Sequence, residues 1–220
     1  MPDIFAIWKP KGPSSNAVMN QIRKALGTRK VGHAGTLDPL AEGILVVGVG
    51  RVGTARLKDF AGGEKEYLAE VRLGMTSSTD DEEGEKTISL NTSVPSRDEV
   101  NEVIRKFVGN IEQTPPIFSA LKIKGVRAYK LARRGDDIKL KPRPAFIKSI
   151  ELLGYVWPII SLKVVTGPGV YIRALARDIG AKLLVGGYLA SLTRTRVGEF
   201  GRAQALSIEE VLTNLSHSPL

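Results

Sequence analysis

The sequence contains no cysteine and only two histidines, His33 and His217. Without cysteine there is no disulfide, no Cys-ligated zinc and no thiol nucleophile, and two histidines cannot build a His-rich metal site. We therefore expect a protein that holds no metal ion and uses no cysteine chemistry.

Long apolar runs are also absent. No stretch approaches the ~18 apolar residues that a membrane-spanning helix needs. The first residues, Met1 to Phe5, lack the basic and long apolar regions of a secretion signal. We expect a cytoplasmic protein that does not enter a membrane.

Acidic residues are fewer than basic ones: 23 Asp and Glu stand against 32 Lys and Arg, which leaves a net charge of +9. Such a surplus favours a polyanionic partner, because cations bind phosphate groups and release counterions. Nucleic acid is the first candidate partner and an anionic membrane surface is the second. The interval from Lys122 to Arg143 holds nine Lys or Arg and two acids. It predicts a basic projecting arm, although a solvated charged loop would have the same composition.

The remaining sequence has the composition of an ordinary globular protein, with 42% hydrophobic residues in 220. Period-two patterns, helical spacing and turn residues predict the elements of the fold. Strands are expected at 3–8, 44–47, 65–73, 146–153 and 159–165, and helices at 14–27, 98–108 and 171–184, while a capping box at 207–210 opens a last helix. The connections include a turn at 9–13, a loop at 32–39 and a solvated acidic loop at 79–85. This order lacks strict βαβ alternation. It predicts an α+β fold with a largely antiparallel sheet.

The segment Gly48 to Gly53 matches the dinucleotide-binding pattern G-x-G-x-x-G and follows an apolar strand. That site also needs a packed helix and an acid at the end of the next strand, about twenty residues on. Here Glu70 falls inside its strand and no further βαβ units follow. A dinucleotide site is therefore the weaker interpretation of this segment.

Six stretches of the sequence follow, in order, the motifs of one known family. Residues Gly32 to Ala41 resemble the signature of the TruB family of tRNA pseudouridine-55 synthases, in its bacterial stand-alone form. The other five are Lys9–Ser15, Lys65–Thr76, Gln113–Lys122, Gly169–Gly180 and Leu192–Phe200. The resemblance covers about residues 4 to 206.

The resemblance implies a pseudouridine synthase catalytic fold: a mixed, mainly antiparallel sheet flanked by helices. It makes residues 1–220 one catalytic domain with a basic inserted arm at about 113–143, and without the C-terminal RNA-binding PUA domain common in the family. It implies isomerisation of uridine 55 in the T loop of tRNA by base flipping. No cofactor is expected, because the reaction has no net redox change, and neither is a guide RNA. We expect a monomer.

By resemblance, Asp38 is the catalytic carboxylate, Arg173 is the cation that pairs with it, and Tyr67 lies against the flipped base. Each also has an ordinary structural interpretation. Asp38 before a proline could be a turn residue, Tyr67 a core aromatic on a strand, and Arg173 a phosphate contact. The ordered motifs favour the catalytic interpretation.

Other residues are expected at the substrate. His33 would occupy the space that the flipped base leaves, Lys9 would support the loop or the RNA backbone, and Leu192 would pack on the base. The other expected substrate-binding residues are Tyr171, Lys122, Lys124 and Arg194. The alternative function is a non-catalytic tRNA-binding or tRNA-folding protein, against which the presence of Asp38, Tyr67 and Arg173 together argues.

Overall fold

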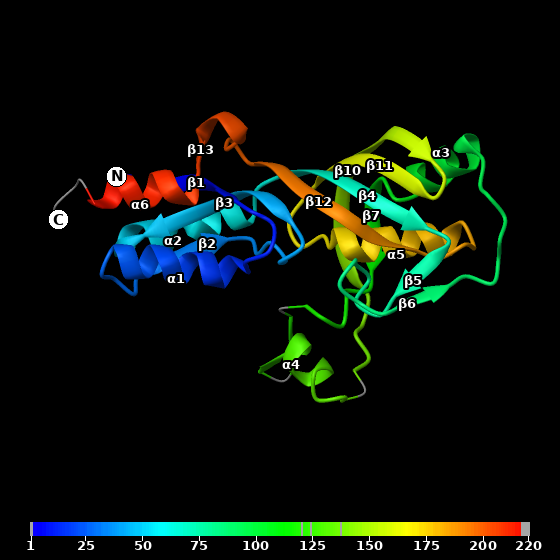
Figure 1. Ribbon diagram of the computed structural model, residues 1–220, viewed down its shortest axis with the longest axis horizontal. Helices are drawn as coiled ribbons and strands as arrows, with labels where there is room; N and C mark the ends of the chain where they lie inside the picture. The colour runs from blue at the N-terminus through cyan, green and yellow to red at the C-terminus, as the bar shows by residue number, and fades with distance from the viewer. Residues whose placement is uncertain (1, 120, 124, 137, 217–220) are drawn as a thin grey trace. The chain divides into compact units, whose positions relative to one another are not determined.

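The structure, a computed structural model, describes residues 2–119, 121–123, 125–136 and 138–216 (Figure 1). The chain forms two compact units, Met1–Leu68 with Leu192–Leu220 and Ala69–Ser191. Two strands, β4 (Lys65–Leu73) and β12 (Gly187–Val197), contribute residues to both units. The fold is α+β with mixed strands that pair mainly antiparallel, which confirms the fold class that the sequence predicts.

The first unit is built around β3 (Glu42–Val49), which pairs antiparallel with two strands and parallel with β12. Its other elements are β1 (Ile4–Lys9), α1 (Ser15–Ala25), β2 (Val31–Ala34), α2 (Gly50–Ala61), the short 3-10 helix η1 (Arg202–Gln204), β13 (Ala205–Leu206) and α6 (Ile208–Ser216). Strands β1 and β2 are the antiparallel neighbours of β3, and β13 runs parallel to β1.

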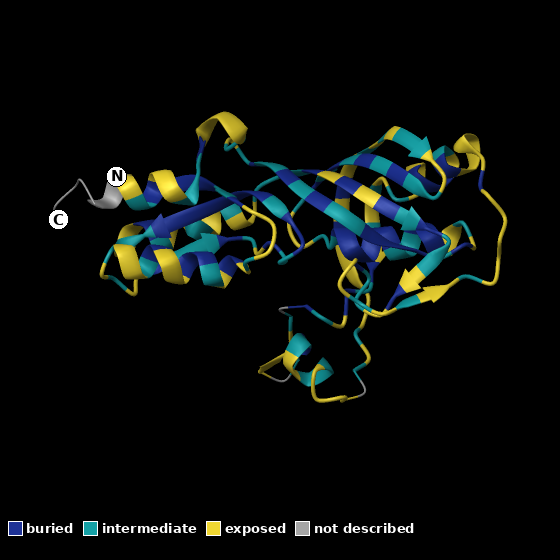
Figure 2. Cartoon of the chain, viewed as in Figure 1, coloured by how far each residue is buried: buried dark blue, intermediate teal, exposed yellow. Residues whose placement is uncertain are grey.

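Strand β3 is buried on both faces, which explains its continuous apolar run. Because side chains alternate along a strand, Leu45 and Val47 join a core with α1 and α6, while Ile44 and Val46 join a second core against α2. Figure 2 shows β3 as buried along most of its length. Two apolar layers thus fix β3 and the segments attached to its ends.

The helix signals in the sequence are confirmed. Ser14 caps α1 by accepting from the backbone N–H of Ala17, and Ser207 and Glu210 form the predicted capping box of α6. In the second unit, Ser96 and Glu99 form another capping box at the start of α3 (Arg97–Arg105).

The second unit contains parts of β4 and β12 together with β11, β10 and β7, in the order β12-β4-β11-β10-β7. Besides α3, its elements are β5 (Met75–Ser77), β6 (Lys86–Ile88), β7 (Gly109–Gln113), β8 (Lys122–Ile123), β9 (Val126–Arg127), α4 (Ala128–Ala132), β10 (Arg143–Val156), β11 (Ile159–Thr166) and α5 (Ile172–Lys182). Strands β10 and β11 form a long antiparallel pair that turns at residues 157–158.

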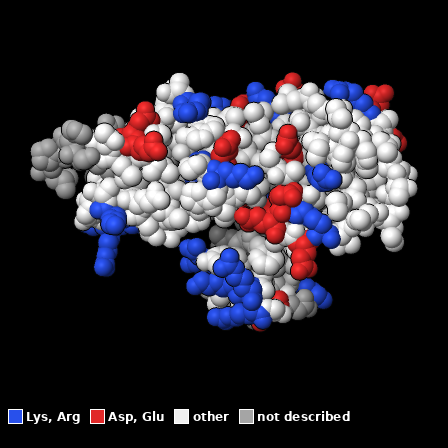
Figure 3. Space-filling view, in the orientation of Figure 1, with Lys and Arg blue, Asp and Glu red and all other residues white. Residues whose placement is uncertain are grey.

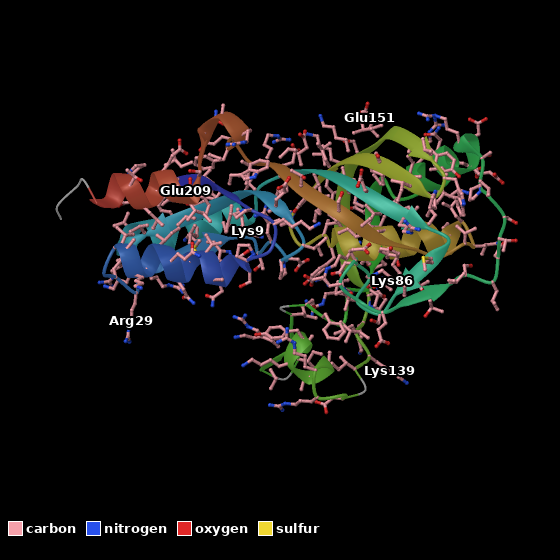
Figure 4. All side chains as sticks on the ribbon, viewed as in Figure 1. Lys9, Arg29, Lys86, Lys139, Glu151 and Glu209 are labelled. Atoms are coloured by element: carbon pink, nitrogen blue, oxygen red, sulfur yellow. The ribbon has the colours of Figure 1, made fainter. Side chains whose placement is uncertain are left out.

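Residues 114–142 leave this sheet after β7 and return at β10. The described part of this segment holds the short β8–β9 hairpin and helix α4, and it extends away from the strands (Figure 1). Lys and Arg side chains gather over it in Figure 3, and Lys139 is among them (Figure 4). This segment is called the basic arm below.

Several local predictions need correction. The expected loop at 32–39 begins as strand β2, and only residues from Gly35 onward are irregular. The acidic loop at 79–85 is not simply solvated, because Asp81 is 2% exposed. Strands β5, β6, β7, β12 and β13 were not expected from the sequence. Helix α2 does begin inside the glycine-rich segment, but the strand that follows it, β4, is not a neighbour of β3 in the sheet because β12 lies between them, so the βαβ unit of a dinucleotide site does not form here.

Candidate active site

Asp38 lies on the irregular segment between β2 and β3, and the backbone on both sides of it is held in place. The buried Ser15 hydroxyl donates to the Leu37 carbonyl at 2.8 Å and accepts from the Leu37 N–H at 2.9 Å. On the other side, the Gly12 N–H donates to the Pro39 carbonyl at 2.8 Å. The turn before α1 and the first residue of that helix therefore position the Asp38 backbone.

Arg194 is a buried cation of this region, and it lies on β12. It is 1% exposed, and its guanidinium donates to the Ile44 carbonyl at 2.7 Å and to the Gly35 carbonyl at 2.9 Å. The strand that carries it lies very close to Gly43, whose φ is +116° and where a Cβ would lie 2.2 Å from the Arg194 carbonyl oxygen. Only glycine fits there without displacing the strand.

The charge of Arg194 acts on the groups around it. Burial lowers the pKa of Arg194, while the charge of Tyr67, a hydrogen bond with the Tyr67 side chain and the charge of Asp38 act in the opposite direction. An arginine keeps its proton in proteins. An opposite charge nearby favours the ionised form of a carboxyl group, so Arg194 favours Asp38 as a carboxylate.

Tyr67 and Leu192 come from β4 and β12 and are 6% and 7% exposed. The Tyr67 side chain is buried and meets Arg194. Lys65, two residues earlier on β4, donates to the Ala61 and Gly63 carbonyls at 2.8 and 2.6 Å and so secures the end of α2. Burial, and next the Arg194 charge, lower the pKa of Lys65.

His33 on β2 is half-buried, and no hydrogen-bond partner for its Nδ1 lies among the described residues. Burial lowers the pKa of His33, and the charges of Arg194 and Arg23 lower it further. At neutral pH the imidazole is therefore uncharged.

Lys9 ends β1 (Figure 4), and its ammonium group donates to the carbonyls of Pro10 and Pro13, both at 2.8 Å. It is fully buried. These contacts fit the loop-supporting role expected for Lys9, because they order the turn whose Gly12 holds the Asp38 segment. Binding of RNA by Lys9 stays a prediction.

Arg173 lies on α5 in the second unit, where it forms an ion pair with Asp81 at 3.3 Å and donates to the carbonyls of Phe118 and Thr79. Both charged side chains are almost fully buried. One turn later, Arg177 pairs with Asp80 at 2.8 Å and donates to the Thr114 carbonyl. Helix α5 therefore connects the acidic loop at 79–85 with the first residues of the basic arm.

The structure brings Asp38, Tyr67, His33 and Arg194 into one electrostatic cluster in the first unit, with Leu192 and Lys9 in the same unit. Tyr171, Arg173 and the exposed Lys122 belong to the second unit. The pairing of Asp38 with Arg173 stays a prediction. Lys124 and His217 lie outside the described residues.

Sequence reasoning missed four supporting residues: Ser15, Gly43, Lys65 and Asp81. Ser15 and Lys65 lie inside motifs that the sequence already marked, so their presence there was the available signal. Asp81 was hidden by an acidic, glycine-containing stretch that looks solvated. Gly43 carries no signal by itself, because its role depends on the approach of β12, which is distant in sequence.

In the part of the chain that the structure describes, no three His, Asp or Glu side chains gather as a metal site would require. None of the described helices has the length and apolar character needed to cross a membrane.

Two family sequence models match the chain. The model for "TruB family pseudouridylate synthase (N terminal domain)" matches residues 23–172, and that for "tRNA pseudouridylate synthase B C-terminal domain" matches residues 173–218. Relatives named tRNA pseudouridine synthase B include one from Phocaeicola vulgatus, 46% identical over 91% of this chain and 88% of the relative. A second, from Parabacteroides distasonis, is 44% identical over 95% and 91%, respectively.

Solved structures agree on the fold. A chain in the crystal structure of a Cbf5-Nop10-Gar1 complex superimposes with a TM-score of 0.74 at 28% identity, covering 96% of this chain and 53% of that one. A chain of an H/ACA RNP bound to a substrate RNA that contains 2'-deoxyuridine gives a TM-score of 0.71 at 26% identity, covering 96% and 52%. This chain spans about half the length of those two. Together with the motif that carries Asp38 and the two matching family models, these similarities show that the chain belongs to the TruB family of pseudouridylate synthases, which are isomerases.

Proposed function

We propose that this chain converts uridine 55 in the T loop of tRNA to pseudouridine, with Asp38 as the catalytic carboxylate. The support for tRNA as substrate is the name of the bacterial relatives that match most of the chain. The support for the T-loop uridine is the match of Gly32 to Ala41 to the signature of the bacterial stand-alone enzymes. The proposal includes a cytoplasmic location and activity without a guide RNA.

The observation that carries the proposal is the way Asp38 is held. Its neighbours Leu37 and Pro39 are tied by backbone hydrogen bonds to Ser15 and Gly12, and the buried Arg194 favours its ionised form. A fixed, ionised carboxylate beside a buried tyrosine is what an attack on a base or sugar, or abstraction of a sugar proton, requires.

The reaction needs few other groups. The bond between N1 and the ribose C1′ breaks, the uracil turns, C5 bonds to C1′, and the C5 proton is lost while N1 gains one. No electron is gained or lost overall. In this proposal the carboxylate of Asp38 assists cleavage of the glycosidic bond, and Tyr67 holds the uracil ring and takes part in removal of the C5 proton.

Base flipping is part of the proposal, because C1′ and C5 of a stacked T-loop uridine are not accessible to a carboxylate. Neutral His33 fills the space that the uridine leaves, and Leu192 packs on the flipped base. The unstacking cost of a few kcal/mol is then offset by contacts of the base with Tyr67 and Leu192.

The test uses an unmodified tRNA transcript, the purified chain, and no added metal, nucleotide or guide RNA. Pseudouridine should form at one position, the T-loop uridine, and a transcript with cytidine at that position should gain none. Product at another uridine would contradict the assignment of substrate position. Tight tRNA binding without any product would instead support a protein that only remodels tRNA.

A further inference from the structure

The first residues of the basic arm are held by helix α5. Strand β7 ends at Gln113, so Thr114 is the first residue of the arm. The Thr114 carbonyl accepts a hydrogen bond from Arg177 on α5 at 2.8 Å. The Gln113 side chain makes two hydrogen bonds, of 2.9 and 3.1 Å, to the backbone of Tyr171, the N-cap of the same helix. The direction in which the arm leaves the sheet therefore depends on its contacts with α5.

Arg177 uses all three nitrogens of its guanidinium in hydrogen bonds. One donates to the Thr114 carbonyl, a second to the Asp80 carboxylate at 2.8 Å, and the third to the neighbouring Asp178 at 2.9 Å. The guanidinium is planar and rigid, so it fixes the directions of these three hydrogen bonds. A lysine carries one nitrogen on a flexible stem and cannot reproduce this geometry. One arginine thus joins α5, the acidic loop at 79–85 and the arm.

Asp80, the partner of Arg177 in the acidic loop, has an uncommon backbone conformation. Its φ is +62°, in the left-handed region that residues other than glycine seldom adopt. Its carbonyl accepts from the Leu189 N–H on β12 at 3.0 Å, which ties the loop to the sheet. Such conformations persist only where several contacts enforce them, and they gather at functional sites. Burial raises the pKa of Asp80, and the charge of Arg177 opposes that rise.

The charge of Arg177 is already matched within the protein. It forms ion pairs with Asp80 at 2.8 Å and Asp178 at 2.9 Å. Two carboxylates this close offset the attraction of the guanidinium for a phosphate group. Arg173, one turn earlier on α5, pairs separately with Asp81. Arg177 is therefore better suited to holding the arm than to binding RNA.

We propose that Arg177 is a positioning residue of the basic arm: held by Asp80, it fixes Thr114 and keeps the arm in the orientation that binds tRNA. This rests on the proposed function, since the arm is expected to contact the substrate. When a binding-competent orientation is only partly populated, the apparent affinity falls in proportion to its population. Once tRNA is bound, its contacts hold the arm in place. Loss of the Arg177 contacts should therefore lower affinity and leave the rate constant at saturating tRNA unchanged.

The orientation of the arm can be measured without RNA. Because the chain has no cysteine, Arg134→Cys in the arm and Ser149→Cys on β10, both at exposed positions, give two unique sites for spin labels. The distribution of distances between the labels should broaden when Arg177→Lys is added. The matched control is Arg105→Lys, the same substitution at an exposed position on α3, which should leave the distribution unchanged. Equal distributions with and without Arg177→Lys would overturn the proposal.

Binding of tRNA provides a second measurement on Arg177→Lys. Affinity should fall about tenfold if the productive orientation drops to roughly a tenth of the population. The slope of log affinity against log salt concentration should not change, because lysine keeps the charge and every cation of the arm remains. The single-turnover rate constant at saturating tRNA should stay within about twofold of the wild type. Wild-type affinity, or a reduced salt slope, would overturn the proposal.

Asp80→Asn keeps the proposal testable if Arg177→Lys does not fold. Asparagine, like aspartate, tolerates the left-handed conformation, so the backbone can be preserved. Removal of a negative charge should by itself tighten RNA binding, whereas loss of the ion pair should weaken it about threefold. The matched control is Glu83→Gln, which removes the same charge from an exposed position of the same loop and should not weaken binding. Equal affinities of the two variants would overturn the proposal.

The two proposals fail differently. An active enzyme whose label distances are unaffected by Arg177→Lys contradicts the positioning role alone. Broadened distances in a chain that forms no pseudouridine at the T loop support the positioning role and contradict the proposed function.

Discussion

Ser15 shows how a single hydroxyl can determine the position of a catalytic group. It makes two hydrogen bonds to the backbone of Leu37, the residue before Asp38, and it is buried. Ser15→Ala should lower the free energy of unfolding by about 1–3 kcal/mol, because a buried N–H and a buried carbonyl lose their partner. Turnover should fall by up to about 10²-fold, since small displacements of a reacting group are costly.

The adjacent Ser14 provides a matched control. Its exposed side chain caps α1 by accepting from the Ala17 N–H, whereas Ser15 bonds to Leu37. Ser14→Ala should cost about 1 kcal/mol of stability and leave turnover unchanged. Urea denaturation and single-turnover rates of both variants check this. Equal reductions of turnover in the two variants would show that Ser15 acts only through overall stability.

His33 gives a pH dependence whose sign follows from its lowered pKa. Burial and the charges of Arg194 and Arg23 disfavour the protonated ring in the folded state. In the unfolded chain the pKa is about 6.5, so the stabilising effect of the neutral ring is complete above that pH. It is lost as the pH falls through the lower, folded-state pKa.

Between about pH 7.5 and about pH 5.5, the free energy of unfolding should therefore fall less in His33→Gln than in the wild type. Urea denaturation of both proteins at these two values measures it. His217 and all carboxyl groups remain in both proteins, so the difference isolates His33. An unchanged pH dependence would contradict the electrostatic description of this cluster.

Gly43 matters at the scale of the element, because it allows β12 to lie against β3. Gly43→Ala would place a Cβ 2.2 Å from the Arg194 carbonyl oxygen at a backbone φ of +116°. Crowding and backbone strain together should cost about 2–6 kcal/mol. Because Arg194 would move with β12, turnover should fall as well.

Gly27→Ala separates strain from crowding. Gly27 also has a positive φ, +61°, but no atom lies within 4 Å of an added Cβ. It should cost only about 1–2 kcal/mol and leave turnover unchanged. Similar decreases in stability for the two variants, measured by urea denaturation, would show that the close approach of β12 is unimportant.

The basic arm should act through charge. Replacing Lys122, Lys130 and Lys139 by Gln should weaken tRNA binding and lower the slope of log affinity against log salt concentration by about 0.9 for each phosphate that is no longer neutralised. The same three charges removed from the α3 region, at Arg97, Arg105 and Lys106, form the control and should change the slope little. Salt titrations of tRNA affinity measure both. Equal slopes for the two triple variants would contradict an RNA-binding arm.

The elements that the sequence predicts well are those with local signals. Helices α1, α3 and α6 carry capping serines and helical spacing, and α5 begins one residue after its predicted start. Strand β12 was missed because its alternating Thr and Arg look solvent-exposed, whereas Arg194 is buried by β3. Short strands such as β5 and β13 exist only through pairing with distant segments, which no local pattern reports.

At the scale of the whole molecule, the candidate site was predicted in part. Motif order identified Asp38, Tyr67 and His33, and the structure gathers them around Arg194. The sequence assigns Arg194 to substrate binding. In the structure its guanidinium is buried and donates to two backbone carbonyls, so Arg194 also supports the backbone of the site. That contact depends on how β3 and β12 pair, so it could be found only from the fold.

The most direct measurement compares wild type with Asp38→Asn on tRNA that carries 5-tritiated uridine, in single turnover and with tRNA affinity measured in parallel. Asparagine has nearly the shape of aspartate but no charge, so binding should be preserved while tritium release falls to the background. Release by Asp38→Asn at the wild-type rate would contradict a catalytic role for this carboxylate. Loss of both tRNA binding and tritium release would contradict an account in which a charged surface binds the tRNA and Asp38 is the reacting group.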